Sequence, residues 1–132
     1  MDSIRVDRLL AAFTGTDLTE LGGCVADSFL YADGDGARPV TRSGFLNALP
    51  ERAELFARLG IGPAVPATVD CERLDDHYLL ARTTWTAPRA GGEPVTLASS
   101  YLLHDDGERL RVVVYLNHGT LPACDARSTT GR

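Results

Sequence analysis

Four strand-like segments fill the second half of the chain and limit the folds that it can adopt. They cover residues 65–74, 78–87, 95–104 and 110–118. Three short polar connections separate these four segments: Asp75-Asp76, Ala90-Gly91-Gly92-Glu93 and Asp105-Asp106-Gly107. Because connections of this length join antiparallel neighbours, the pattern predicts a four-stranded meander.

Three helices are predicted before this meander. Apolar residues recur at helical spacing from Ser3 to near Gly15, which indicates a first helix. Asp17 resembles the start of a capping box, and the short helix after it is expected to bury Leu18, Leu21 and Val25. A third helix starts at Thr41 or Ser43 and ends at Gly60, with Pro50 expected to kink or divide it.

The segment 25–34 places a carboxylate at the far end of a strand that is predicted to begin at Ser28. Phe29, Tyr31 and Asp33 are two residues apart, so in a strand all three point to one face. A carboxylate beside aromatic rings is unusual, and apolar walls would raise its pKa. Asp33 is therefore a candidate general base, although Asp33-Gly34 is also a common start of a turn, and residues 33–39 are turn-rich.

Composition excludes several classes of function. The chain has 132 residues, the size of one domain, and carries a net charge of −5 that opposes nonspecific binding to nucleic acid. All 13 cationic side chains are arginine, so Schiff-base and Walker lysines are excluded. The absence of lysine, with many Ala, Gly and Arg residues, suggests a bacterial genome rich in G and C.

Cysteine and histidine spacing indicates neither disulfides nor a metal site. Cys24, Cys71 and Cys124 are odd in number and far apart, which fits reduced thiols in a cytoplasm. His77, His104 and His118 lack metal-ligand spacing. No signal peptide or membrane span is recognised, so a cytoplasmic protein without metal or cofactor, and without membrane or nucleic-acid partners, is expected.

The order of elements and several short motifs resemble the nuclear transport factor two superfamily, and most closely its SnoaL-like branch. The motifs are Gly15-Thr16-Asp17-Leu18, Ala26-Asp27, Arg42-Ser43-Gly44-Phe45-Leu46, and Asp106-Gly107 followed by Leu110-Arg111-Val112. The resemblance implies an α+β fold: a cone-shaped barrel of a curved mixed or antiparallel sheet wrapped by three N-terminal helices. Residues 1–119 would form the cone and its open-ended pocket, and residues 120–132 a flexible tail.

The resemblance also implies candidate catalytic residues. In ketosteroid isomerases of this superfamily an aspartate acts as general base, and matching Ala26-Asp27 to their pattern brings Asp33 onto it. Their two hydrogen-bond donors fall at Leu9 and Ser99, so only Ser99 could donate and steroid isomerisation itself is disfavoured. SnoaL-like cyclases use an acid/base group on the last strand, where this chain has His118.

Strand alternation predicts which side chains face the pocket. The expected set is Leu97, Ser99, Tyr101, Thr83, Trp85, Val112, Val114, Leu116 and His118, with Arg111, Val113 and Tyr115 on the outer face. The aromatic residues could instead be core, and His118 could simply end a strand.

Two hypotheses follow from these predictions. In the first, a small cofactor-free enzyme of polyketide-cyclase or isomerase type acts on an apolar, carbonyl-containing small molecule. Its catalytic residues would be Asp33 and His118, and its substrate-binding residues Tyr31, Trp85, Ser99, Tyr101, Val114 and Leu116. In the second, the cone is a noncatalytic module that binds a small molecule or dimerises. In this second hypothesis the outer face of the sheet pairs with a second subunit, and the resemblance itself implies a homodimer.

Overall fold

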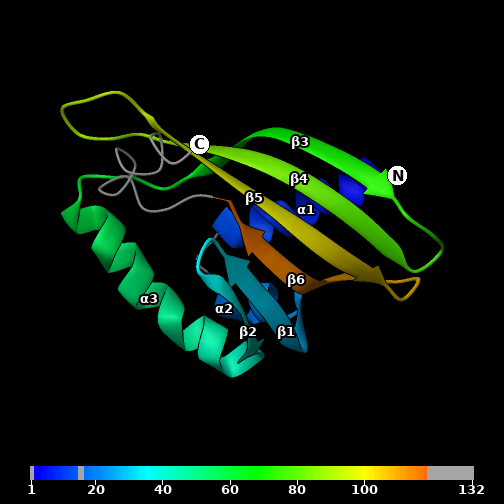
Figure 1. Cartoon of the computed structure of the whole chain (residues 1–132). Coiled ribbons are helices and arrows are strands. Elements are labelled where there is room, and N and C mark those ends of the chain that lie inside the picture. The colour runs from blue at the N-terminus through cyan, green and yellow to red at the C-terminus, as the bar shows by residue number, and fades with distance from the viewer. Residues whose placement is uncertain (1, 15–16, 119–132) are drawn as a thin grey trace.

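Six strands form one curved sheet in the spatial order β2-β1-β6-β5-β4-β3 (Figure 1). The computed structural model describes residues 2–14 and 17–118. The helices are α1 (Asp2–Thr14), α2 (Leu18–Gly22) and α3 (Arg42–Arg58). The strands are β1 (Val25–Asp33), β2 (Gly36–Thr41), β3 (Val65–Arg73), β4 (Tyr78–Ala87), β5 (Val95–Asp105) and β6 (Leu110–Asn117). The predicted C-terminal tail lies outside the described residues.

The predicted meander is confirmed, and the sheet is mixed. Strands β3 to β6 pair with their sequence neighbours in antiparallel fashion, whereas β6 also pairs with β1 in parallel. The sheet stays open, with β2 and β3 as its edges, so the cone is not a closed barrel. The edge strand β2 was predicted as turn, because its glycine and proline are typical of turns; Pro39 is tolerated at an edge.

The helices differ from prediction at two places. Helix α3 continues through Pro50 for 17 residues and is not divided, since Phe45 packs its first half against the sheet and outweighs the backbone hydrogen bond that proline removes. The second helix ends early, because Val25 already pairs with Val112 in the sheet. Leu18, predicted to be buried, is 45% exposed.

The core lies between the concave face of the sheet and the helices. In Figure 1, α1 crosses behind β3–β5 and α3 lies at the β1–β2 end. Aromatic rings fill the space between them, with edge-to-face contacts from Tyr101 to Tyr115 (ring centres 5.0 Å apart) and from Phe29 to Phe45 (5.3 Å). Rings buried in this way supply much of the apolar area removed from water.

An extra residue in β6 changes which of its side chains face this core. Leu102 pairs with Val114 and Leu103 with Val112, which leaves Val113 as a bulge. The alternation therefore shifts, and Tyr115, predicted on the outer face, is 9% exposed inside the cone. Val114, Leu116 and His118, predicted inside, follow the outer face instead. Before the bulge, the predictions for Arg111 (outer face) and Val112 (inner face) are confirmed.

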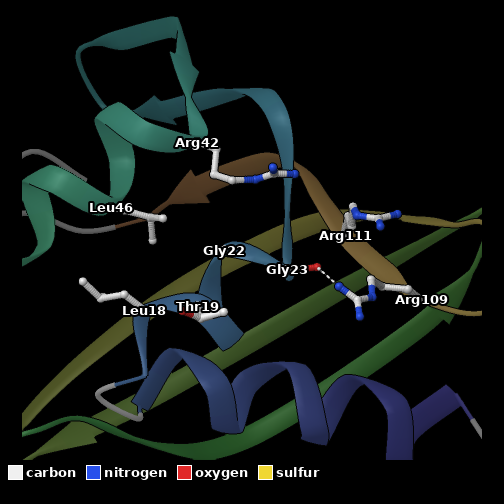
Figure 2. Close-up of a pocket in the computed structure, with 8 residues that line it drawn as sticks. All are labelled: Leu18, Thr19, Gly22, Gly23, Arg42, Leu46, Arg109 and Arg111. Carbon is white, nitrogen blue, oxygen red and sulfur yellow. Dashed lines mark hydrogen bonds between the residues drawn. The ribbon is translucent and has the colours of Figure 1, made fainter.

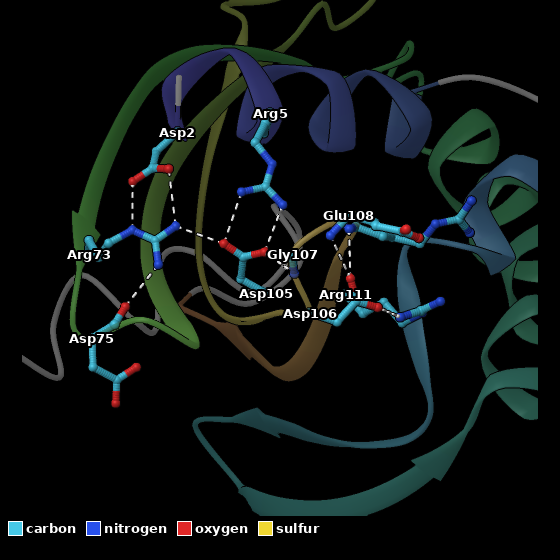
Figure 3. Close-up of polar contacts among 10 residues, drawn as sticks. Asp2, Arg5, Arg73, Asp75, Asp105, Asp106, Gly107, Glu108 and Arg111 are labelled. Carbon is cyan, nitrogen blue, oxygen red and sulfur yellow. Dashed lines mark hydrogen bonds and ion pairs between the residues drawn. The ribbon is translucent and has the colours of Figure 1, made fainter.

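A network of carboxylates and guanidinium groups joins α1 to the sheet (Figure 3). Asp105, at the end of β5, accepts hydrogen bonds from Arg5 at 2.8 and 2.9 Å and from Arg73 at 2.8 Å. Arg73 also binds both carboxylate oxygens of Asp2. The network fixes the start of α1 over the ends of β3 and β5.

Candidate functional site

A pocket of about 320 Å³ lies between α3 and the β1–β2 hairpin. Its lining residues are Tyr31, Arg38 and Val40 from the hairpin, and Gly44, Phe45, Ala48, Leu49 and Arg52 from α3. Phe45, Leu49 and Arg52 recur at the spacing that places residues on one helix face, so α3 presents two apolar side chains and a cation together. The pocket is mainly apolar, with two guanidinium groups as its charged components.

The two arginines of the pocket make no ion pair with a carboxylate among the described residues. The Cζ of Arg38 lies 4.9 Å from the centre of the Tyr31 ring, a cation–π contact. Burial opposes the charge of Arg52, but the phenol groups of Tyr115 and Tyr31 more than compensate and hold the arginine pKa above its ordinary value. Both arginines carry guanidinium groups, which can interact with an oxygen-bearing ligand.

Tyr31 connects the pocket to the end of β6. The Asn117 amide donates a hydrogen bond of 3.2 Å to the Tyr31 hydroxyl, and the ring centre of Tyr31 is 5.3 Å from that of Tyr115. The Tyr31 ring is thus held in place from two sides, which limits the entropy that a ligand stacked on it would lose.

Deeper in the cone, three predicted site residues form a buried polar chain. The Trp85 indole donates to Ser99 Oγ at 2.8 Å, and Ser99 Oγ donates to the Tyr101 hydroxyl at 2.8 Å. Burial raises the pKa of Tyr101, so the phenol stays protonated. Beside this chain, the buried hydroxyl of Thr83 has no hydrogen-bond partner among the described residues. The inward orientation predicted for these four residues is confirmed.

No protein-family profile matches the chain, and no curated protein matches it. Solved structures do. An NTF-2 like protein of unknown function from Shewanella oneidensis MR-1 is 14% identical, with a TM-score of 0.69 over 90% of this chain and 100% of the other. A hypothetical protein with a ketosteroid isomerase-like fold from Catenulispora acidiphila, in complex with trimethylamine, is 21% identical, with a TM-score of 0.60 over 94% and 91% of the two chains.

The chain has the nuclear transport factor two-like fold. A protein of this fold from Pseudomonas putida, provisionally described as a polyketide cyclase, is 15% identical, with a TM-score of 0.58 over 88% of this chain and 89% of that one. Identities this low establish a shared fold and carry no activity with them.

Within this nuclear transport factor two-like fold, Asp33 caps the turn between β1 and β2. Its carboxylate accepts a hydrogen bond of 2.9 Å from the backbone N–H of Asp35, and the residue is half-buried. By alternation Asp33 shares the inner face with Tyr31, which agrees with the sequence prediction. Turn capping is thus one role of Asp33, and its predicted role as a base stays a prediction.

The structure does not bring Asp33 and His118 together. His118 Nε2 lies 2.7 Å from Ser100 Oγ, and Ser100 points away from the core face that carries Ser99 and Tyr101. The prediction that His118 reaches the pocket mouth is wrong, because the bulge at Val113 reverses the alternation after it. The proton relay inferred from the sequence therefore lacks its second member at the pocket.

Sequence reasoning missed most of the pocket lining. Of the predicted site residues only Tyr31 lines the pocket, whereas α3 supplies five lining residues. The spacing of Phe45, Leu49 and Arg52 was available as a signal, but Pro50, between the second and third of them, was expected to kink or divide the helix.

Neither metal-binding nor membrane-spanning features are found in residues 2–14 and 17–118. There, no group of three or more His, Cys, Asp and Glu side chains is arranged to hold a metal ion. None of the helices described is both long and apolar enough to cross a membrane. Cys24 and Cys71 are free thiols, and burial raises the pKa of both, which disfavours a nucleophilic role. Cys124 lies outside the described residues.

Proposed function

We propose that this protein binds an apolar small molecule bearing a carbonyl group in the pocket between α3 and the β1–β2 hairpin. The observation that carries this proposal is the lining itself: Tyr31, Phe45 and Leu49 offer apolar surface, and Arg52 offers a cationic donor. Apolar walls with a few convergent polar groups are typical of small-molecule sites. The guanidinium would hold the carbonyl oxygen, and the rings would cover the apolar body.

The charge of the pocket argues against one alternative ligand class. The neighbour from Catenulispora acidiphila was solved with trimethylamine, an amine that is cationic near neutral pH. In this chain Arg38 and Arg52 would repel such a ligand, and no acidic residue lines the pocket to offset them. A ligand with electron-rich oxygen is favoured instead.

Binding can be tested with 1-acetonaphthone, a flat apolar ketone, by isothermal titration calorimetry. We expect one site per chain, and Arg52→Met, which keeps the aliphatic stem, should weaken binding by about tenfold because it removes a charged hydrogen-bond donor. Arg58→Met is the matched control, since Arg58 lies on the same helix, is exposed and does not line the pocket. Equal affinity of the Arg52 and Arg58 variants would refute the proposal.

A second candidate function is proton transfer from a carbon next to that carbonyl, with Asp33 as base. It is favoured by the position of Asp33, two residues beyond Tyr31 on the same strand face. The same ketone tests it, because its methyl protons would exchange with solvent in D₂O. We expect Asp33→Asn to slow enzyme-dependent exchange by about 100-fold or more while the amide oxygen still caps the turn. If the methyl protons of the ketone exchange no faster with the protein than in buffer alone, the proposal of catalysis is wrong and only the binding function remains.

We also propose that two copies associate through the outer face of the sheet. Four apolar residues there are only half-buried: Leu80, Leu102, Val114 and Leu116. Contiguous apolar surface on an uncovered sheet face is typical of an interface. Sedimentation equilibrium should give a dimer, and Leu102→Arg should convert it to a monomer with an unchanged circular dichroism spectrum. A monomeric parent protein at ~100 μM, where an interface of μM affinity is filled, would contradict the proposal.

A further inference from the structure

A groove of about 490 Å³ lies between α2, the first turn of α3 and the start of β6 (Figure 2). It shares no lining residue with the pocket between α3 and the β1–β2 hairpin. Its charged lining residues are Arg42, Arg109 and Arg111, and no acidic residue lines it. Figure 2 shows Leu18 and Leu46 at one end of the groove and Arg109 and Arg111 at the other. In a chain with a net charge of −5, this clustering of cations in one groove is notable.

Two of these arginines have unused hydrogen-bonding capacity. The Nε of Arg42 is buried without a partner among the described residues, and its Nη2 pairs at 2.8 Å with Asp27, whose side chain is 92% exposed. The guanidinium group of Arg109 makes one hydrogen bond within the described part of the chain, a long one of 3.4 Å from Nη1 to the backbone oxygen of Gly23. Across the described residues, no carboxylate lies within ion-pair distance of Arg109, whereas Arg111 is paired with Asp106 at 2.9 Å.

Gly23 leaves the space in which Arg109 lies. A Cβ at this position would come within 2.5 Å of Arg109 Nη1, so any larger residue would displace that guanidinium. The backbone of Gly23, with φ −73° and ψ −10°, is one that alanine adopts without strain. Glycine is thus needed at position 23 because a side chain there would displace Arg109, and not because the backbone requires a glycine.

We propose that this groove binds an organic anion, with its carboxylate or phosphate group at the Arg109 end and its apolar body at the Leu18 end. Guanidinium groups bind both kinds of oxyanion through paired N–H donors. Leu18 is 45% exposed, so an apolar body would cover surface that water now contacts. This groove is distinct from the pocket between α3 and the β1–β2 hairpin, called here the carbonyl pocket, and the proposal does not depend on the function proposed for that pocket.

The test uses hexyl phosphate, hexanoate and the neutral hexanol as probes with the full chain, followed by isothermal titration calorimetry. We expect at least one of the two anions to bind at one site at least tenfold more tightly than hexanol. Arg109→Gln should weaken the binding of that anion by about tenfold, the loss expected when a charge-assisted hydrogen bond is removed. Gly23→Ala should weaken it in the same way without altering any charge, because it displaces the same guanidinium.

Two control variants locate the binding. Arg8→Gln removes an exposed arginine of α1 that lines neither site, and Arg52→Met removes the cation of the carbonyl pocket. Both should bind the anion as the parent protein does. The proposal is overturned if neither anion binds more tightly than hexanol, if Arg109→Gln leaves the affinity unchanged, or if Arg52→Met abolishes binding, which would place the anion in the other pocket.

Discussion

Asp105 links helix α1 to two strands of the sheet, because it lies at the end of β5 and is bound by Arg5 of α1 and by Arg73 of β3. Its side chain is 8% exposed, is bound by Arg5 and Arg73, and accepts a further hydrogen bond from the N–H of Gly107. The hydrogen bonds from Arg5 and Arg73 hold the pKa of this carboxyl well below its usual range. Replacing it would leave two guanidinium groups without their shared acceptor.

Asp105→Asn is therefore expected to lower the free energy of unfolding by roughly 2 kcal/mol at pH 7, less than for a fully buried pair because both arginines are partly exposed. Since the folded-state pKa is depressed, the stabilisation is complete above the ordinary value of 3.8 and is lost as the pH falls below it. Urea unfolding at pH 7, 5 and 3 should show the difference between parent and variant shrink only at pH 3.

Asp106→Asn provides the comparison. Backbone N–H groups of the turn and Arg111 lower the pKa of Asp106 to about 2, but its side chain is 38% exposed. Exposed ion pairs contribute little, so we expect Asp106→Asn to destabilise the protein clearly less than Asp105→Asn does. Equal losses for the two variants would show that burial of Asp105 adds nothing to its contacts.

At the scale of elements, the bulge in β6 decides which residues belong to the core. Tyr115 packs against Tyr31, Phe45 and Tyr101, while its neighbour Leu116 pairs with Ser100 on the other face. Regular alternation assigns the two residues the other way round, so they form a direct test of the bulge.

Tyr115→Ala should destabilise the protein by about 3–5 kcal/mol, the cost of removing a large buried ring, whereas Leu116→Ala should cost clearly less. Urea unfolding followed by circular dichroism measures both. Because Leu116 lies in the proposed dimer interface, its effect should grow with protein concentration and that of Tyr115 should not. A larger loss for Leu116 at low concentration would mean that β6 has no bulge.

The sequence predicts the strands of the meander to within a residue because each alternates between clear turn signals. It does not predict the bulge, since Val112, Val113 and Val114 are identical and alternation cannot show which one is extra. Helix α3 was expected to be kinked or divided at Pro50 because proline disfavours a helix interior, and tertiary packing keeps it one helix of 17 residues. Both features matter for the site. The bulge places His118 on the outer face, and the uninterrupted helix brings Arg52 into the pocket lining.

At the scale of the whole molecule, the topology places the final strand near the centre of the sheet. β6 pairs with β1 on one side and with β5 on the other, so it joins the N-terminal hairpin to the meander. Among the described strands, β6 is the one through which the β1–β2 hairpin joins the rest of the sheet. Strand pairings between residues so distant in sequence are costly to form and come late in folding.

A chain that ends at residue 109 should consequently fail to form a cooperative fold, although it retains five of the six strands. Its amide resonances in a ¹H–¹⁵N spectrum are expected to collapse toward random-coil values, in contrast to the full chain. A well-dispersed spectrum with a single cooperative thermal transition would show instead that the two parts of the sheet are stable apart.

The central place of β6 also sets the moment during translation at which this protein can become complete. Until residue 117 has left the ribosome, β1 and β5 each present an unpaired edge with free backbone donors and acceptors. Such edges can pair with other newly made chains, and the pairing of β6 with β1 and β5 covers both of these edges at once.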